Sequence, residues 1–434
     1  MTDAALPSAG AGRPARDIRT AVEKRLKARH AAERRFRFYG LAAILIAIAF
    51  LGVLLGRIGL QGYSAFETYT VELPVYVDPS RIDPADVQGA NYDLMIADQL
   101  VTRLGLADPT GDLGLAAKDV LSPDLGFQVL EQVREDPSLI GRTITLDAPI
   151  GDDADLYYKG HYGREIVEDD RTLTDQQLTI LDRMQDKGMV SSGFNTGLFT
   201  RSDSTQPELA GLLGAIVGSA MMLAVTALLA VPIGTLAAVY LEEFAPRNRF
   251  TEIVEVNINN LAAVPSIVYG LLGLAVFINW MGLPRSSPLV GGLVLALMAL
   301  PTVIIATRSS LKAVPPSIRE AALGVGASRT QTVFHHVLPL AMPGVMTGTI
   351  IALAHALGET APLLMIGMIA FVPGVPEAIT SASSTLPTQI FIWENASERA
   401  FHERTAAAII VLLGFMIVMN AAAIFLRSRF ERRW

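Results

Sequence analysis

The feature that most constrains this sequence is a series of apolar runs, each long enough to cross a lipid bilayer. A membrane-spanning helix needs roughly 20 mostly apolar residues. Six segments meet that requirement: 38–60, 209–241, 253–280, 289–307, 338–371 and 405–426. Only 18% of the 434 residues are charged, whereas soluble domains carry about 25%. The sequence therefore predicts an all-α polytopic membrane protein with six transmembrane helices.

The charge distribution predicts the orientation of these helices. Residues 1–38 contain 10 Lys or Arg and 4 Asp or Glu, whereas residues 62–207 contain 11 and 26. Basic residues also follow the last apolar run, and Lys and Arg are enriched in cytoplasmic segments. Both termini are thus predicted to be cytoplasmic, with residues 431–434 forming a short tail. We interpret residues 38–60 as uncleaved transmembrane helix 1, because the basic leader is long and no convincing cleavage site follows it.

The basic N-terminal segment, residues 1–37, is expected to be a cytoplasmic helix that contacts membrane lipid. Its Lys and Arg side chains are interspersed with acids. Attraction to anionic lipid explains such a segment beside a membrane anchor. Nucleic acid is therefore not an expected partner.

Residues 61–207 are predicted to form a small mixed α/β extracytoplasmic domain inserted between transmembrane helices 1 and 2. Val71, Leu73, Val75 and Val77 alternate with other residues, as in a half-buried strand. A second strand is expected at Thr143–Leu146, and helical spacing occurs at Tyr92–Leu104, Leu125–Val133 and Asp175–Met184. Asp152, Asp153 and Asp155 fit no complete calcium-loop pattern, so we interpret them as a solvated acidic surface.

The loop at residues 315–339 predicts a protruding knob. Ser317-x-x-Glu320 has the form of a capping box, which predicts a short helix beginning at Ile318. Gly324 and Gly326 should end it. Ser328-x-x-Gln331 predicts a second short helix that ends before Pro339. Two short helices hinged at glycines suit docking to a cytoplasmic partner. His335 and His336 are adjacent, so on a helix they would point apart, and no metal site is expected there.

This loop resembles the EAA loop of binding-protein-dependent ABC transporter permeases. The matching residues are Glu320, Ala321, Ala322, Gly326, Leu338 and Pro339. His336 departs from the pattern, since the family has an apolar residue, typically Ile, at this position. The resemblance implies a type I ABC importer permease architecture over residues 208–430, in which the loop couples the chain to a separate ATPase.

Three further segments are similar to the phosphate-specific permeases of the PstA type. They are Tyr240-Leu-Glu-Glu243, Pro265-Ser-Ile-Val-Tyr-Gly270 and Gly358-Glu-Thr-Ala-Pro-Leu-Leu364. Residues 61–207 are an insertion relative to the shorter members. The resemblance implies import of inorganic phosphate across a bacterial inner membrane. The implied partners are a PstC-type second permease, two copies of a PstB-type ATPase and a periplasmic PstS-type binding protein.

The resemblance also implies that this chain is not an enzyme and binds no cofactor, and no metal site is expected from its residues. ATP and Mg²⁺ would be held by the ATPase. The sequence agrees, because it contains no G-x-x-x-x-G-K-[ST] phosphate loop.

Polar residues within the apolar runs indicate a candidate phosphate pathway at Arg308, His355, Glu359 and Thr360. Ionisable residues in membrane spans usually face a pathway or a partner. His355 and Glu359 are four residues apart, so on a helix they share one face. The family usually has Arg where His355 stands. Two other interpretations remain open: His355 and Glu359 satisfy each other, and Arg308 is a positive-inside anchor.

Three alternative functions are compatible with these residues. The same architecture would serve another oxyanion, such as sulfate or molybdate. A proton-coupled carrier would use His355 and Glu359 as its proton relay. A membrane sensor would receive a ligand on residues 61–207 and signal through the loop at 315–339.

Overall fold

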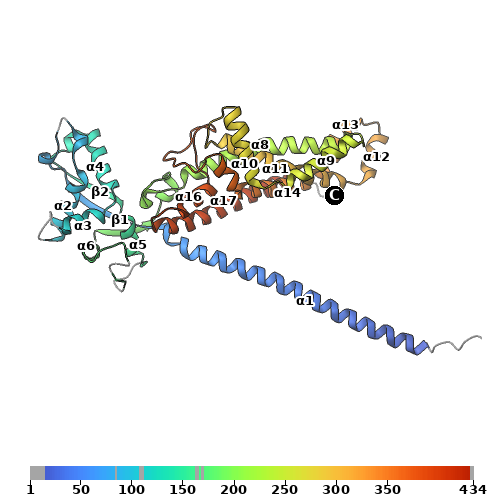
Figure 1. Ribbon diagram of the computed structural model, residues 1–434, viewed down its shortest axis with the longest axis horizontal. Coiled ribbons are helices and arrows are strands. Elements are labelled where there is room, and N and C mark those ends of the chain that lie inside the picture. The colour runs from blue at the N-terminus through green and yellow to red at the C-terminus, as the bar shows by residue number, and fades with distance from the viewer. Residues whose placement is uncertain (1–14, 84–85, 107–111, 162–165, 168–170, 431–434) are drawn as a thin grey trace, which may run out of the picture. The chain divides into compact units, whose positions relative to one another are not determined.

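The computed structural model describes residues 15–83, 86–106, 112–161, 166–167 and 171–430. The predicted tail at 431–434 lies outside these residues. The chain divides into two compact units, residues 1–58 and 59–434. Figure 1 shows the elements of both units.

The described part of the first unit is most of α1 (Ala15–Gly62), a helix of 48 residues. A rise of 1.5 Å per residue makes such a helix about 70 Å long, whereas a bilayer crossing needs roughly 20 residues. The helix passes the expected boundary between residues 37 and 38 without a break. The basic segment and transmembrane helix 1 are therefore one continuous element.

The second unit begins with an α/β domain, whose described part has a three-stranded antiparallel sheet in the order β2-β1-β3. Its strands are β1 (Glu67–Tyr76), β2 (Thr143–Pro149) and β3 (Val190–Phe194). Its helices are α2 (Tyr92–Leu104), α3 (Asp112–Asp119), α4 (Asp124–Glu135), α5 (Asp152–Tyr158) and α6 (Asp175–Asp186), with short 3-10 turns at 64–66, 79–81, 87–89 and 137–139.

The core of this domain follows from the alternation in β1. Val71, Leu73 and Val75 are fully buried, and Leu73 pairs with Leu146 of β2. The predicted strands at 71–77 and 143–146 and the helices α2, α4 and α6 are confirmed. The helices α3 and α5 and strand β3 were not predicted. β3 has mostly exposed side chains and no apolar alternation, so it is held by its ladder to β1 rather than by burial.

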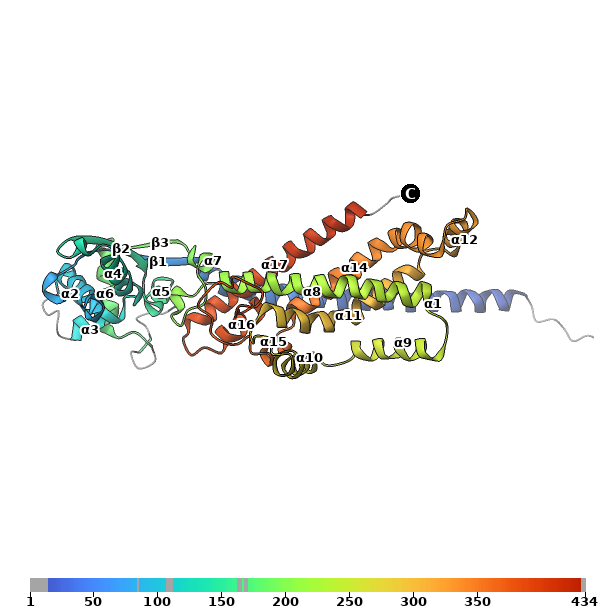
Figure 2. The same ribbon diagram turned by 90° about the horizontal axis from the view of Figure 1, so that it is seen from above.

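A helical domain completes the second unit (Figure 2). Its helices are α7 (Gly197–Thr200), α8 (Leu213–Val239), α9 (Arg249–Ala262), α10 (Ser266–Leu272), α11 (Pro288–Lys312), α12 (Pro316–Gly324), α13 (Arg329–Gln331), α14 (Leu338–Gly358), α15 (Ala361–Met365), α16 (Leu386–Glu394) and α17 (Ala400–Phe430). A 3-10 turn lies at 207–209, and π-helical turns lie at Tyr240–Phe244, Gly273–Trp280 and Thr332–Val337.

The third predicted span is not one straight helix. α9 and the helix from Ser266 to Trp280 are bent by 104° at the break between them. Pro265 lies in this break; it cannot donate a backbone hydrogen bond, and it disfavours helical geometry at Val264. Among the described residues, five helices are long and apolar enough to span a membrane, or six if the bent pair counts as one span.

The bounds predicted for the fifth span, 338–371, are also wrong at both ends. α13, the π-turn at 332–337 and α14 form one helix from Arg329 to Gly358. The chain then leaves helical geometry at Glu359, and the short α15 starts beyond it. Pro362 belongs to α15, and its missing N–H suits the first turn of a new helix.

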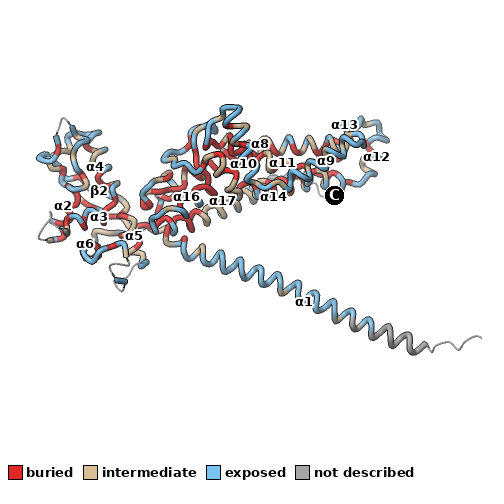
Figure 3. The backbone as a smooth tube through the Cα atoms, in the orientation of Figure 1, coloured by how far each residue is buried: buried red, intermediate tan, exposed pale blue. Residues whose placement is uncertain are grey.

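Close contact between α8, α11 and α14 forms the centre of the helical domain, and Figure 3 shows buried residues along these helices among intermediate and exposed ones. At Gly292, a Cβ atom would lie 2.5 Å from Cβ of Val225 and 2.9 Å from the carbonyl oxygen of Met222. At Gly348, a Cβ atom would lie 2.1 Å from Cβ of Ala306. Small residues let membrane helices approach this closely.

Candidate functional site

The knob, defined here as residues 315–331, contains α12, a glycine turn and α13. Its first helix begins at Pro316 with Pro315 as N-cap, so the expected start at Ile318 is wrong. Ser317 is the second residue of the helix, where Pro316 already supplies a preorganised first position. The second capping box is confirmed, because Ser328 and Gln331 exchange both side-chain bonds, at 3.2 and 2.9 Å.

The second helix of the loop does not end before Pro339 as expected. It passes through the π-turn Thr332–Val337 directly into α14, with Leu338 and Pro339 in the first turn. Pro339 cannot donate a backbone bond, and the chain accommodates it by a change of helix type rather than by a break.

The end of α12 presents an exposed apolar surface. Val325 is 85% exposed and Leu323 is 50% exposed. Glu320 and Ala321 are exposed as well, whereas Ala322 is buried against the domain. Gly326 has φ +90°, a conformation that glycine adopts without steric cost. Within the Glu-Ala-Ala motif, two residues are therefore exposed and one is buried.

The base of the knob is a set of ion pairs around the π-turn Tyr240–Phe244. Arg319 of α12 contacts Glu243 at 2.5 Å, and the carbonyls of Val314 and Leu311 accept from the same guanidinium at 2.8 and 2.9 Å. The neighbouring Glu242 belongs to a second set of pairs with α11. Sequence reasoning missed Arg319, although it directly precedes the recognised Glu-Ala-Ala.

Arg308, a candidate pathway residue, is charge-balanced within the chain. Its guanidinium lies 2.7 Å from Glu255 and 3.3 Å from Glu242, and its side chain is 16% exposed. Lys312 adds a 3.6 Å contact to Glu242. In this conformation, two basic side chains share two carboxylates at the end of α11.

The structure brings His355 and Glu359 together. His355 Nε2 lies 3.2 Å from Glu359 Oε1, with the side chains 68% and 24% exposed. Contrary to expectation, Glu359 does not lie in a helix, because α14 ends at Gly358. Thr360 is the N-cap of α15. The carboxylate thus comes from the connection between two helices.

Arg308 lies at a different level of the helical domain. A Cβ atom at Gly344 would contact Ser310, and one at Gly348 would contact Ala306, so Arg308 is level with residues 344–348. His355 is seven residues beyond Gly348, which corresponds to about 10 Å along a helix. The four candidate pathway residues therefore do not form one cluster.

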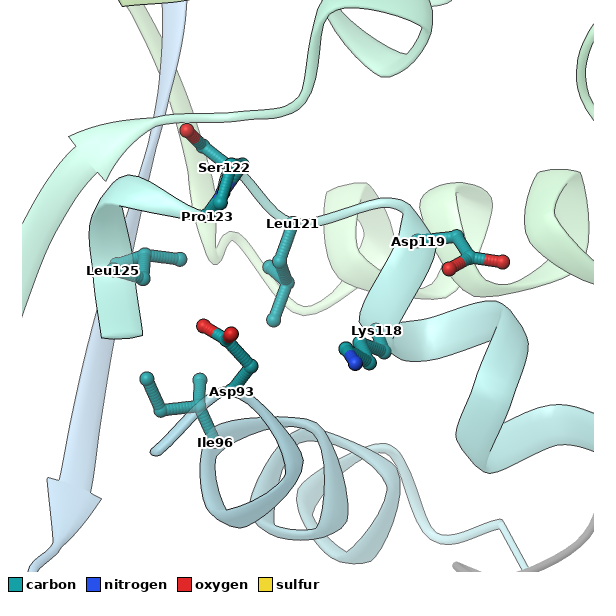
Figure 4. Close-up of a pocket in the computed structure, with 8 residues that line it drawn as sticks. All are labelled: Asp93, Ile96, Lys118, Asp119, Leu121, Ser122, Pro123 and Leu125. Atoms are coloured by element: carbon teal, nitrogen blue, oxygen red, sulfur yellow. The ribbon is translucent and has the colours of Figure 1, made fainter. Parts of the chain in front are cut away.

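Two cavities were not predicted from the sequence. One, of about 570 Å³, lies beside the knob and is bordered by both His335 and His336. The other, of about 230 Å³, lies in the α/β domain between α2 and the α3–α4 connection, where Asp93 faces Leu121 and Leu125 (Figure 4). No cluster of three metal-ligating side chains occurs among the described residues.

A buried ion cluster joins the α/β domain to the start of α17. Lys159 Nζ lies 2.6 Å from Asp155 Oδ2 and 2.9 Å from Glu403 Oε1, and all three side chains are 10% exposed or less. Asp155 Oδ1 also accepts from the backbone of Tyr69 at 2.8 Å. The expected solvated acidic surface is therefore wrong at Asp155, whose charge is paired across the junction between domains.

Glu208 extends this cluster toward the cavity in the α/β domain. Its Oε1 accepts a 2.7 Å hydrogen bond from Ser122, a residue that lines the cavity. Its Oε2 is buried and has no hydrogen-bond partner among the described residues. Burial raises the pKa of Glu208, and burial likewise raises the pKa of Asp155 in spite of Lys159.

Comparison with known families divides the chain in two. Residues 230–434 match the family described as binding-protein-dependent transport system inner membrane component. Residues 23–168 match a domain of unknown function (DUF3333).

Two relatives are similar to part of the chain. The phosphate transport system permease protein PstA 1 of Mycobacterium tuberculosis (strain CDC 1551 / Oshkosh) is 32% identical over 224 residues, 51% of this chain and 72% of the relative. The PstA protein of Haemophilus influenzae (strain ATCC 51907 / DSM 11121 / KW20 / Rd) is 36% identical over 167 residues, 38% of this chain and 58% of the relative. A solved structure of the MetNI methionine ABC transporter has a TM-score of 0.40 at 19% identity and covers 50% of this chain and 95% of its own.

Replacement of Glu208 by Gln is expected to flatten the pH dependence of stability. A carboxyl whose pKa is raised on folding stabilises the native state at acid pH, and this contribution is lost as the pH rises through the raised value. Gln mimics the protonated form. The loss of stability from pH 5 to pH 8, followed by thermal unfolding of the full chain in nanodiscs, should therefore be smaller in the variant.

The exposed Asp147, replaced by Asn, is the matched control and should retain the wild-type pH dependence. A Glu208→Gln variant with the full wild-type pH dependence would contradict the raised pKa of Glu208.

Proposed function

The chain belongs to the family of binding-protein-dependent transport system inner membrane components, and we propose that it is the permease subunit of an ATP-driven importer of inorganic phosphate. The observation that carries this proposal is the knob, which combines the EAA positions with an exposed apolar tip and a base of ion pairs. The relatives named as phosphate transport permeases support the substrate.

In this proposal, the permease does no covalent chemistry and works within a larger assembly. A PstC-type permease would complete the translocation path, and two PstB-type ATPases would hold ATP and Mg²⁺. A periplasmic PstS-type protein would deliver phosphate. The α/β domain would lie outside the bacterial inner membrane, and both termini would be cytoplasmic, in agreement with the basic ends of the chain.

The knob is the proposed contact to the ATPase. Glu320, Ala321, Leu323 and Val325 are exposed on α12 and the turn after it. Docking would remove the exposed apolar side chains of Leu323 and Val325 from water, which favours association. We therefore assign Leu323 and Val325 as the anchors, with Ala322 and Gly326 setting the shape of the knob.

His355, Glu359 and Thr360 are the proposed pathway residues of this chain. Phosphate requires hydrogen-bond donors, and a protonated histidine supplies both a donor and a positive charge. His355 is 68% exposed, and its Nε2 lies 3.2 Å from Glu359 Oε1. Arg308 would contribute only in a conformation in which Glu242 and Glu255 release it.

The purified assembly should hydrolyse ATP faster when phosphate-loaded binding protein is added. The assembly would be reconstituted in nanodiscs, and ATPase rates would be compared with binding protein carrying phosphate, sulfate or no ligand. Stimulation by the phosphate form alone is the expected result. Stimulation by the sulfate-loaded form instead would change the assigned substrate from phosphate to sulfate. An equal response to all three forms would overturn the importer proposal in favour of a sensor.

Val325→Asp is expected to weaken assembly with the ATPase at least tenfold. The substitution places a charge on a surface that an interface would dehydrate. Binding of the ATPase to the nanodisc-held permease would be measured by biolayer interferometry. Val167, which is 66% exposed in the α/β domain, gives a matched control, Val167→Asp, that should bind normally. Equal binding by both variants would remove the knob as the docking site.

His355→Ala is expected to reduce phosphate uptake by proteoliposomes about tenfold, the effect of losing about 1.4 kcal/mol of interaction. His402 is also exposed and lies near a carboxylate, with its Nδ1 3.7 Å from Glu394 Oε2, so His402→Ala is the matched control. ATPase assembly should be unchanged in both. Normal uptake by His355→Ala would exclude this side chain from the pathway.

A further inference from the structure

We propose that Arg319 and Glu243 form the joint through which movement of the knob is transmitted to the membrane-spanning helices. This inference rests on the proposed function, since it assumes that an ATPase moves the knob. Neither residue touches the transported ion in this assignment. Both are positioning residues that connect α12 to α8 and α11.

The first argument is the number of bonds made by one side chain. The Arg319 guanidinium contacts Glu243 through Nη2 at 2.5 Å and through Nε at 3.2 Å to both carboxylate oxygens. Its remaining donors reach the carbonyls of Val314 and Leu311 at 2.8 and 2.9 Å. A rigid, planar group held at both edges resists bending in a way that a single flexible contact does not.

The second argument is the position of the partners. Leu311 is in the last turn of α11, and Val314 lies between α11 and α12. Glu243 lies in the π-turn that directly continues α8. A single arginine therefore links the knob to the ends of two helices that pack along each other in the centre of the domain.

The third argument is burial. The Glu243 side chain is 10% exposed and that of Arg319 is 24% exposed. Val239, Leu311 and Val314 are buried in the apolar cluster beneath them, against which Phe244 and Ile318 also pack. A shielded pair is screened by salt much less than a surface pair, so the joint persists at physiological ionic strength.

The fourth argument is the convergence of other basic residues on the same π-turn. Glu242 holds Arg308 at 3.3 Å and Lys312 at 3.6 Å. The Arg329 guanidinium, at the start of α13, lies 5.5 Å from the centre of the Phe244 ring. Three consecutive residues, Glu242, Glu243 and Phe244, thus bind α11, α12 and α13, and π-turns are frequent at functional sites.

These contacts make α12 and the end of α8 move as one body. α12 has nine residues, of which only Ala322 is buried, so its apolar packing alone holds it weakly. A force on the exposed tip at Val325 would reach α8 through Glu243 and α11 through the two carbonyls. Without the pair, the knob would still dock but would move independently of the membrane-spanning helices.

The test is the ratio of stimulated to basal ATPase activity in Glu243→Gln and Arg319→Lys assemblies. Gln keeps the shape of the carboxylate without its charge, and Lys keeps the charge without the planar fork. In both variants, the ratio of the ATPase rate with phosphate-loaded binding protein to the basal rate of the same assembly should fall at least fivefold. The exposed Glu252 on the nearby α9, replaced by Gln, is the matched control and should keep full stimulation.

A cross-link separates coupling from folding. The chain has no cysteine, so Glu243→Cys with Arg319→Cys introduces one defined pair, bridged by a reducible bis-methanethiosulfonate linker. Linked protein should regain stimulation, and reduction should abolish it. This readout also decides the outcome if the single variants assemble poorly, because a merely structural role predicts no reversible change in the ratio.

Two results would overturn the joint. One is unchanged stimulation in both Glu243→Gln and Arg319→Lys. The other is a cross-linked protein whose ATPase activity is stimulated no more than that of its reduced form. If no loaded binding protein stimulates the wild-type assembly, the proposed importer function itself is wrong. That result can be told apart from the two results that overturn the joint.

Discussion

The backbone hydrogen bond is the interaction on which this structure depends, because an apolar bilayer offers no substitute for it. Long helices satisfy the requirement along α8, α11, α14 and α17. The two places where the helix is broken, at Pro265 and after Gly358, retain local bonds: the Pro265 carbonyl accepts from Val268, and that of Thr360 accepts from Leu363 and Leu364. At Gly270, a Cβ atom would lie 2.7 Å from Cα of Pro362, so the segments after the two breaks pack on each other.

Charge is handled differently at the two ends of the second unit. At the junction with the α/β domain, Lys159, Asp155 and Glu403 are almost fully dehydrated. Such pairs add little net stability over an apolar contact, but removal of one partner is costly. Around the π-turn at 240–244, the ion pairs are only partly buried and connect helix ends that are distant in sequence. The first arrangement fixes two domains together, and the second links several short segments.

The sequence predicted those parts of the fold that depend on local periodicity. Alternation at Val71, Leu73 and Val75 gave β1, and helical spacing gave α2 with its exact bounds. Strand β3 and the ion pairs of Arg308 and Arg319 were missed for one reason, because they depend on residues distant in sequence: β3 pairs with β1, and the ion pairs join residues 53 to 76 positions apart. In the knob, the motif positions came from family resemblance, whereas the helix start at Pro316 followed from proline geometry that the Ser317 pattern obscured.

The π-turns also bear on how this chain can change during evolution. Each residue of an α-helix advances the direction of the side chains by about 100°, so one inserted residue would misdirect everything beyond it. A π-turn confines the extra residue to one wide turn and leaves the phase of the flanking helix intact. One π-turn, Tyr240–Phe244, adjoins α8. The others are Thr332–Val337, which adjoins α14, and Gly273–Trp280, which adjoins α10. An alignment that places a one-residue gap at such a turn therefore records a local change of helix type, with the helices on either side still in register.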